Sequence, residues 1–126
     1  MNLQPRKQEI TVQREFLKST EGLIHKVGGV TLDAAEFTAG ADGFVRSGSA
    51  VSFDEDSGLA VPFTAESDGI PYVLAHDVRI IEGQNPIVGA VETAFLDRSV
   101  VTDGDKVTVP VTDEFIEAAS NRYHLR

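Results

Sequence analysis

Apolar and polar residues alternate on both sides of a five-residue acidic connection, residues 54–58, near the middle of the chain. The alternating residues are Val51 and Phe53 before the connection and Leu59, Val61 and Phe63 after it. A spacing of two residues places each set on one face of a β-strand, so residues 43–63 predict a β-hairpin whose apolar face starts the core. The three carboxylates of the connection would be costly to bury without partners, which places the turn at the surface.

Two other segments carry a clear strand pattern. Val30 and Leu32 restart an alternating run after a pair of glycines, which would break a helix. Residues 70–75 form a short and almost continuous apolar run, which predicts a buried strand. Pro71 has no N–H group to donate, so it belongs at the start or the edge of that strand.

The second half of the chain adds two shorter patterns and one ambiguous stretch. Residues 78–81 indicate a short strand, and three valines alternate over residues 107–111, where Pro110 predicts an edge position. Residues 87–101 fit one face of a helix or one face of a strand. Gly89 disfavours the helix, and we favour the strand.

Two short helical segments are expected. Residues 34–37 can make a single helical turn with Asp33 as its cap. Thr112 or Asp113 caps a helix that runs to about Ser120, with acidic residues near its N-terminus. The buried face of this helix would consist of Phe115, Ile116 and Ala119.

Residues 1–20 are mostly polar and are expected to form an extended or mobile arm in front of a single β-rich domain, residues 21–126. Within the arm, Ile10, Val12 and Phe16 are separated by even numbers of positions, interrupted by Arg14, as in an edge strand that awaits a partner, although a frayed terminus has the same composition. The predicted fold class is therefore α+β, mainly β: a small compact domain with an N-terminal arm and a short C-terminal helix.

Charge is distributed unevenly over the 126 residues, whose net charge is −9. Residues 1–20 carry four Lys/Arg against two Glu, residues 21–120 carry five against eighteen Asp/Glu, and residues 121–126 carry two against none. An acidic body lacks the dense Lys/Arg surface that nucleic acid requires, so no nucleic-acid partner is expected. The N-terminal segment has no continuous apolar stretch, and cysteine is absent. The N-terminal segment is therefore expected to be neither a signal peptide nor a membrane span, and the protein is expected to be made in a cytoplasm. Without cysteine, no disulfide and no Cys-ligated zinc are expected.

The candidate chemistry is sparse. Asp54, Glu55 and Asp56 could bind a divalent cation, and His76 with Asp77 could act as a base and its orienting carboxylate. The acidic loop lacks the glycine and the distal glutamate of an EF-hand, so a solvated turn is the favoured interpretation. No catalytic site, metal or cofactor is expected. An interaction protein whose arm adds a strand to the sheet of another chain fits these observations better.

Five segments in a fixed order resemble a known family. They are GGVTLDAAEF, GFVRSGSAVSF, SGLAVPF, DGIPYVLAHDV and NPIVGAV. Together they cover roughly residues 22–91 and are similar to the lambda-type head decoration proteins of tailed bacteriophages. The arm of the lambda-type members is rich in Thr, Ser and Pro, whereas this arm is charged, and residues 107–126 extend beyond the matched part.

The resemblance implies a non-enzymatic virion protein with a β-tulip-like body. Such a protein binds the major capsid protein as a homotrimer, at three-fold positions on the outer surface of the expanded head, and stabilises the shell against DNA pressure. The arm residues that would pair with a capsid strand are Gln8, Glu9, Ile10, Thr11, Val12, Gln13, Arg14, Glu15 and Phe16. Arg122 and Arg126, at the cationic C-terminal end, are a candidate secondary contact.

Two other functions have the same composition. A tail or baseplate component of a virion would also be small and rich in strands. A small metal-dependent enzyme would use Asp54, Asp56 and His76.

Overall fold

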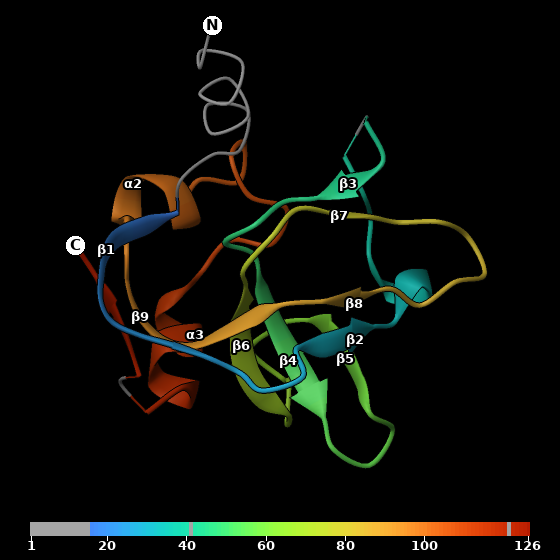
Figure 1. Ribbon diagram of the computed structural model, residues 1–126, viewed down its shortest axis with the longest axis horizontal. Helices are drawn as coiled ribbons and strands as arrows, with labels where there is room; N and C mark the ends of the chain where they lie inside the picture. Colours follow the sequence, from blue (N-terminus) through green and yellow to red (C-terminus); the bar gives the residue numbers. More distant parts are fainter. Residues whose placement is uncertain (1–15, 41, 121) are drawn as a thin grey trace, which may run out of the picture.

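The protein is described by a computed structural model, in which residues 16–40, 42–120 and 122–126 are placed, without the side chains of residues 20–22 (Figure 1). The elements in chain order are β1 (Leu17–His25), β2 (Val30–Leu32), the 3-10 turn η1 (Ala34–Glu36), β3 (Phe44–Val45), β4 (Ala50–Asp54), β5 (Leu59–Pro62), β6 (Ile70–Leu74), β7 (Val78–Arg79), β8 (Ile87–Val88), β9 (Ala90–Leu96), α2 (Arg98–Val101), α3 (Asp113–Ala118) and β10 (Tyr123–Leu125). The predicted class, a mainly β α+β fold with a short C-terminal helix, is confirmed. Among the described residues, no helix is long and apolar enough to cross a membrane.

The main sheet curls back toward itself. Its strand order is β1-β9-β6-β4-β5-β2-β8, and β10 joins β9 in parallel. Because β8 and β9 are consecutive parts of one extended segment, interrupted only at Gly89, this segment pairs with β2 through its first part and with β6 through its second. The end of the strand order at β8 therefore returns to β9, the strand beside β1. A separate two-stranded ribbon, β3 with β7, extends from the curled sheet (Figure 1).

Gly29 permits this closure. Its φ is +64°, and a Cβ atom built there would lie 2.4 Å from the carbonyl oxygen of Val88. Only glycine allows the chain to cross β8 at this distance before it enters β2. The helix-breaking role that the sequence predicts for Gly28 and Gly29 is confirmed, since both have positive φ.

The central strands are buried on both faces, which creates two cores. The core enclosed by the curl is formed by Val30, Leu32, Phe37, Val45, Val51, Ala60, Tyr72, Leu74, Val78, Val88 and Ala90. The second core lies between the outer face of the sheet and the C-terminal segments; its main residues are Phe16, Ala50, Phe63, Val73, Val91, Ala94, Leu96, Val101, Val107, Val111, Phe115 and Tyr123. Burial on both faces explains the continuous apolar run of β6, so the predicted buried strand at residues 70–75 is confirmed.

The predicted hairpin is confirmed, but its common apolar face is wrong. Val51 lies opposite Pro62, and Phe53 lies opposite Ala60. Leu59 and Val61 therefore belong to the other face of the sheet. The turn sets a register that joins odd positions of β4 to even positions of β5, and this register is tolerated because both faces of the sheet are covered.

The predicted edge strand at residues 107–111 is wrong. The segment is irregular and is held by Ser49, whose Oγ accepts the N–H groups of Thr108 (3.1 Å) and Val109 (3.3 Å). The N–H of Ala50 also donates to the carbonyl of Val109 over 2.9 Å. The alternating valines still pack inward, because the second core needs apolar side chains at this position.

The other predicted elements are confirmed with shifted bounds. Asp33 caps η1, and Thr112 Oγ1 accepts the N–H of Phe115 at the start of α3. Residues 87–96 are extended, as favoured from the sequence, but the predicted strand ends there and residues 98–101 form α2. The strand indicated at residues 78–81 is limited to β7. β10 was not predicted.

The start of the body differs from the predicted boundary at residue 20. Phe16 is 4% exposed in the second core, and β1 begins at Leu17 and pairs with β9. Phe16 is therefore a core residue of the body instead of a residue of the arm. The remaining predicted arm residues, 8–15, lie outside the described residues.

Candidate functional site

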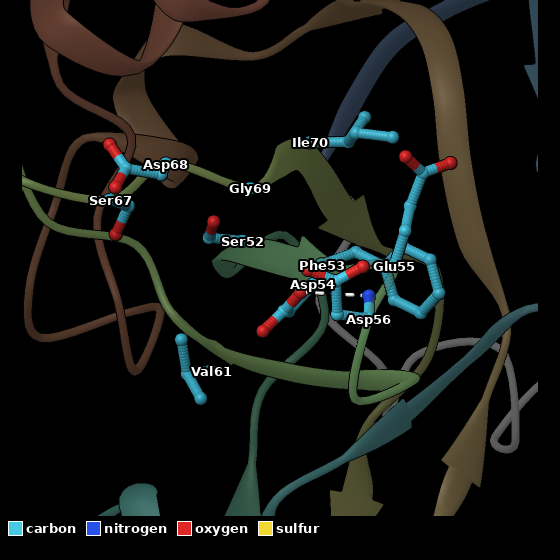
Figure 2. A pocket seen from close by; sticks show the side chains of 10 residues that line it. All are labelled: Ser52, Phe53, Asp54, Glu55, Asp56, Val61, Ser67, Asp68, Gly69 and Ile70. Carbon is cyan, nitrogen blue, oxygen red and sulfur yellow. Dashed lines mark hydrogen bonds between the residues drawn. The ribbon is translucent and has the colours of Figure 1, made fainter.

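A cleft of about 500 Å³ opens beside the tip of the β4–β5 hairpin (Figure 2). It is lined by Ser52, Phe53, Asp54, Glu55, Asp56, Val61, Ser67, Asp68, Gly69 and Ile70. One rim is the acidic turn after β4, and the other is the polar loop before β6. The acidic rim was predicted as a surface turn, but nothing in the sequence placed it beside the second rim.

Local hydrogen bonds fix both rims. Asp54 Oδ1 accepts the N–H of Asp56 over 2.9 Å, which shapes the acidic turn. On the opposite rim, Ser67 Oγ accepts the N–H of Thr64 over 2.9 Å. Gly69 brings the second rim close, because a Cβ atom there would lie 2.4 Å from the carbonyl oxygen of Phe53. The cleft is therefore built from ordered turns.

Ser52 lies between the two rims. It is 3% exposed, and its hydroxyl forms no hydrogen bond with any residue of the described part of the chain. In Figure 2 its oxygen points away from β4 toward the space beside Ser67 and Gly69. Ser52 shares the outer face of β4 with Asp54 and lies opposite Val61 of β5.

The cleft is strongly acidic. Asp54, Glu55, Asp56 and Asp68 are all exposed, and none of them forms an ion pair with a described residue. The ammonium of Lys26 lies over the ring of Phe53, 5.0 Å from its centre, but Lys26 does not line the cleft. Such an arrangement can attract a cationic group and offer it several oxygen acceptors.

The structure does not assemble the residues of the candidate metal-dependent enzyme. Asp54 and Asp56 lie near Ile70, the first residue of β6, whereas His76 lies two residues beyond Leu74, the last residue of that strand. The strand between these two ends spans about 13 Å. Within the described ranges, no group of three or more His, Cys, Asp or Glu side chains is placed to hold a metal ion.

His76 and Asp77 do not form the expected base and carboxylate pair. The Asp77 carboxylate accepts the N–H of Ser47 over 2.7 Å and a guanidinium N–H of Arg46 over 3.1 Å. His76 is exposed and its ring lies against Gly89. Asp77 therefore fixes the β3 connection instead of orienting an imidazole.

The two C-terminal arginines differ in role. The Arg122 guanidinium donates to the carbonyl oxygens of Glu92 (2.6 Å) and Pro71 (2.5 Å) and lies over the rings of Tyr72 and Tyr123. Arg122 thus joins β10 to the sheet, and its donor groups are used within the body. Arg126 lies over the ring of Phe95 at the surface and stays a candidate contact.

The sequence pattern does not mark Ser52 as part of a site. The only signal was a lone polar residue between Val51 and Phe53 in a strand, which by itself indicates an exposed position. The structure instead buries Ser52 at the floor of an acidic cleft.

No family model matches the chain, and comparisons with curated proteins and with solved structures found no match either.

Proposed function

We propose that this protein is a head decoration protein of a tailed bacteriophage. It binds the major capsid protein as a homotrimer at three-fold positions of the expanded head and stabilises the shell from outside. Residues 8–15 pair with a strand of the capsid protein, and residues 16–126 form the body that this contact anchors. No reaction is catalysed.

The observation that carries this proposal is the place of β1, which is at one end of the strand order and pairs with β9. In the sequence, the predicted arm residues 8–15 come just before Phe16 and β1. Among the described residues, the second core already includes Phe16, the residue just before β1. An extended segment that continues from an edge strand can add to the sheet of another chain and gain backbone hydrogen bonds there.

The order of the strands also supports the proposal. The segments that resemble the decoration proteins include β4, β5 and β6, which are adjacent in the sheet and form its centre. The resemblance implies that these segments build the body. The acidic surface suits a protein that must not adhere to DNA and other polyanions released from lysed cells.

The test is binding to expanded phage heads that lack a decoration protein. We expect the purified protein to saturate these heads at three copies per three-fold site and to raise the temperature at which they release DNA. Removal of residues 1–15 should weaken binding by about 100-fold, because several backbone hydrogen bonds are lost.

A proline pair provides a matched control for the arm. Ile10→Pro with Val12→Pro removes two N–H donors without shortening the chain, whereas Ile10→Ala with Val12→Ala keeps them. The proline variant should bind more weakly than the alanine variant. Unimpaired binding by the truncated chain would refute the arm contact, and binding to tails but not to heads would refute capsid decoration.

A further inference from the structure

We propose that the acidic cleft beside the β4–β5 turn is a docking site for a lysine or arginine side chain of a partner protein. The site is defined by the residues of the cleft itself. It is independent of the capsid function proposed above, which depends on residues 8–15.

Ser52 supplies the first reason. Every fully buried side-chain oxygen or nitrogen of the described residues has a hydrogen-bond partner. The Ser52 hydroxyl has none, so its oxygen keeps contact with solvent, and the cleft that it lines provides this contact. Within the described part of the chain only water can satisfy this hydroxyl, and a ligand that brings an N–H group can take the place of that water. Ser52 therefore offers an acceptor to a donor-bearing ligand.

The charge of the cleft defines the donor. Four carboxylates, those of Asp54, Glu55, Asp56 and Asp68, surround the opening without an ion pair to a described residue. A cation relieves their mutual repulsion. Ser52 and Asp54 are two residues apart on one face of β4, about 7 Å between Cα atoms, so one ammonium or guanidinium group can reach both oxygens.

The apolar wall favours a basic side chain over a bare ion. Val61 lies opposite Ser52 in the register and is half-buried. The methylene groups of lysine or arginine can pack along such a surface while the cation reaches the carboxylates. A metal ion would need a closer set of ligands than the described residues provide. The volume of about 500 Å³ is within the range of clefts that accept small organic groups.

The experiment is an NMR titration of the full chain with blocked tripeptides. Acetyl-Gly-Lys-Gly-amide and its arginine counterpart are the probes, and the norleucine counterpart keeps the stem without the charge. We expect saturable shifts of the amide signals of residues 52–56 and 67–70 with the lysine and arginine peptides at millimolar concentration. The norleucine peptide should cause none.

Two variants connect the binding to named atoms. Ser52→Ala removes the hydroxyl, and Asp54→Asn removes a charge but keeps the oxygen that accepts the Asp56 N–H. Each should weaken binding of the lysine peptide by about tenfold, the lower limit for a hydrogen bond to a charged group. Asp113→Asn on α3 changes the net charge equally, lies outside the cleft and should leave binding unchanged.

The outcomes separate the alternatives. Absence of saturable shifts, equal binding of the norleucine peptide, or unchanged affinity of Ser52→Ala and Asp54→Asn would overturn the site. Spermidine and acetyl-Lys-Lys-Lys-amide carry the same charge, so tighter binding of spermidine would assign the cleft to a free polyamine and overturn a protein partner. Loss of head binding in the truncated chain with retained peptide binding would separate this site from the arm.

Discussion

At the scale of single residues, two buried serines near the start of β4 have opposite roles: Ser49 comes just before the strand, and Ser52 lies within it. Ser49 Oγ donates to the carbonyl of Arg46 over 2.7 Å and accepts the N–H groups of Thr108 and Val109. It thereby replaces the missing strand pairing of residues 107–111. Ser52 is almost as buried but has no such partner in the described part of the chain.

Ser49→Ala should therefore destabilise the protein strongly. It leaves two buried or half-buried N–H groups without an acceptor, which costs about 2–3 kcal/mol of unfolding free energy. Thermal unfolding followed by circular dichroism should show a melting temperature lower by about 10 °C. Ser52→Ala is the matched control and should change the melting temperature little. Equal losses in the two variants would contradict this account of Ser49.

Tyr123 makes the stability dependent on alkaline pH. It is 1% exposed, its hydroxyl donates to the carbonyl of Val91, and burial raises the pKa of its phenol far above the ordinary value near 10. Between pH 10 and the raised pKa the unfolded chain has lost the phenolic proton while the folded chain keeps it. The contribution of Tyr123 to the free energy of unfolding is therefore fully present below pH 10. Above pH 10 the free energy of unfolding declines, by up to about 1.4 kcal/mol per pH unit.

Tyr123→Phe should remove most of that decline. At neutral pH the variant should lose about 1 kcal/mol, because the hydrogen bond to Val91 is absent. Urea unfolding at intervals from pH 9 to about 11.5 measures both effects. Burial also raises the pKa of Tyr72, so Tyr72→Phe is the comparison at a second tyrosine. An unchanged decline in Tyr123→Phe would show that other groups cause it.

At the scale of elements, closure of the sheet depends on two adjacent glycines in the β1–β2 turn. Both have positive φ, but only Gly29 faces another strand closely; a Cβ atom at Gly28 would meet no atom within 4 Å. Gly28 therefore needs to be glycine only because of its positive φ, whereas Gly29 also needs to be glycine because a side chain would clash with β8.

Gly29→Ala should be much more damaging than Gly28→Ala. Gly28→Ala adds only the strain of a left-handed conformation, about 1 kcal/mol. Gly29→Ala adds a clash with the Val88 carbonyl, which should raise the loss by about 2 kcal/mol and separate β2 from β8. Chemical unfolding measures the loss, and faster hydrogen exchange of the Val30 and Thr31 amides would locate it. Equal effects would mean that β2 and β8 adapt easily.

Sequence patterns predicted elements well where a local rule decides them. Asp33 and Thr112 cap helical turns, and the apolar run of β6 marks a strand buried on both faces. The alternation of residues 107–111 predicted a strand wrongly, because an irregular segment that covers a core also needs apolar side chains facing inward. The register of the hairpin was missed because alternation cannot show that both faces are covered.

At the scale of the whole molecule, the second core joins segments from both ends of the described part of the chain. Phe16 lies against Gly48 and packs in the same core as Tyr123, near the C-terminus. The first part of β1 and β10 both pair with β9, so β9 joins the two ends of the described body. The stability of the body thus depends on where a truncation ends.

Removal of residues 1–15 should leave the unfolding temperature of the body nearly unchanged, whereas removal of residues 1–20 should lower it strongly. The longer deletion removes Phe16, a buried aromatic whose loss typically costs about 3–5 kcal/mol, and the first pairs of β1 with β9. Differential scanning calorimetry measures the difference. Phe16→Ala in the full chain is the control and should account for much of it. Equal stability of the two truncated chains would place the start of the body after residue 20.

Local sequence patterns are enough to predict the mainly β class, the caps, the turns and most strand positions, because these depend on neighbouring residues. Long-range packing sets which faces pair, where Arg122 and Phe16 pack, and that Ser52 lies in a cleft between an acidic turn and a polar loop. These features arise from contacts between residues distant along the chain. Such contacts are selected by the burial of both sheet faces together, and no short window of sequence contains that information.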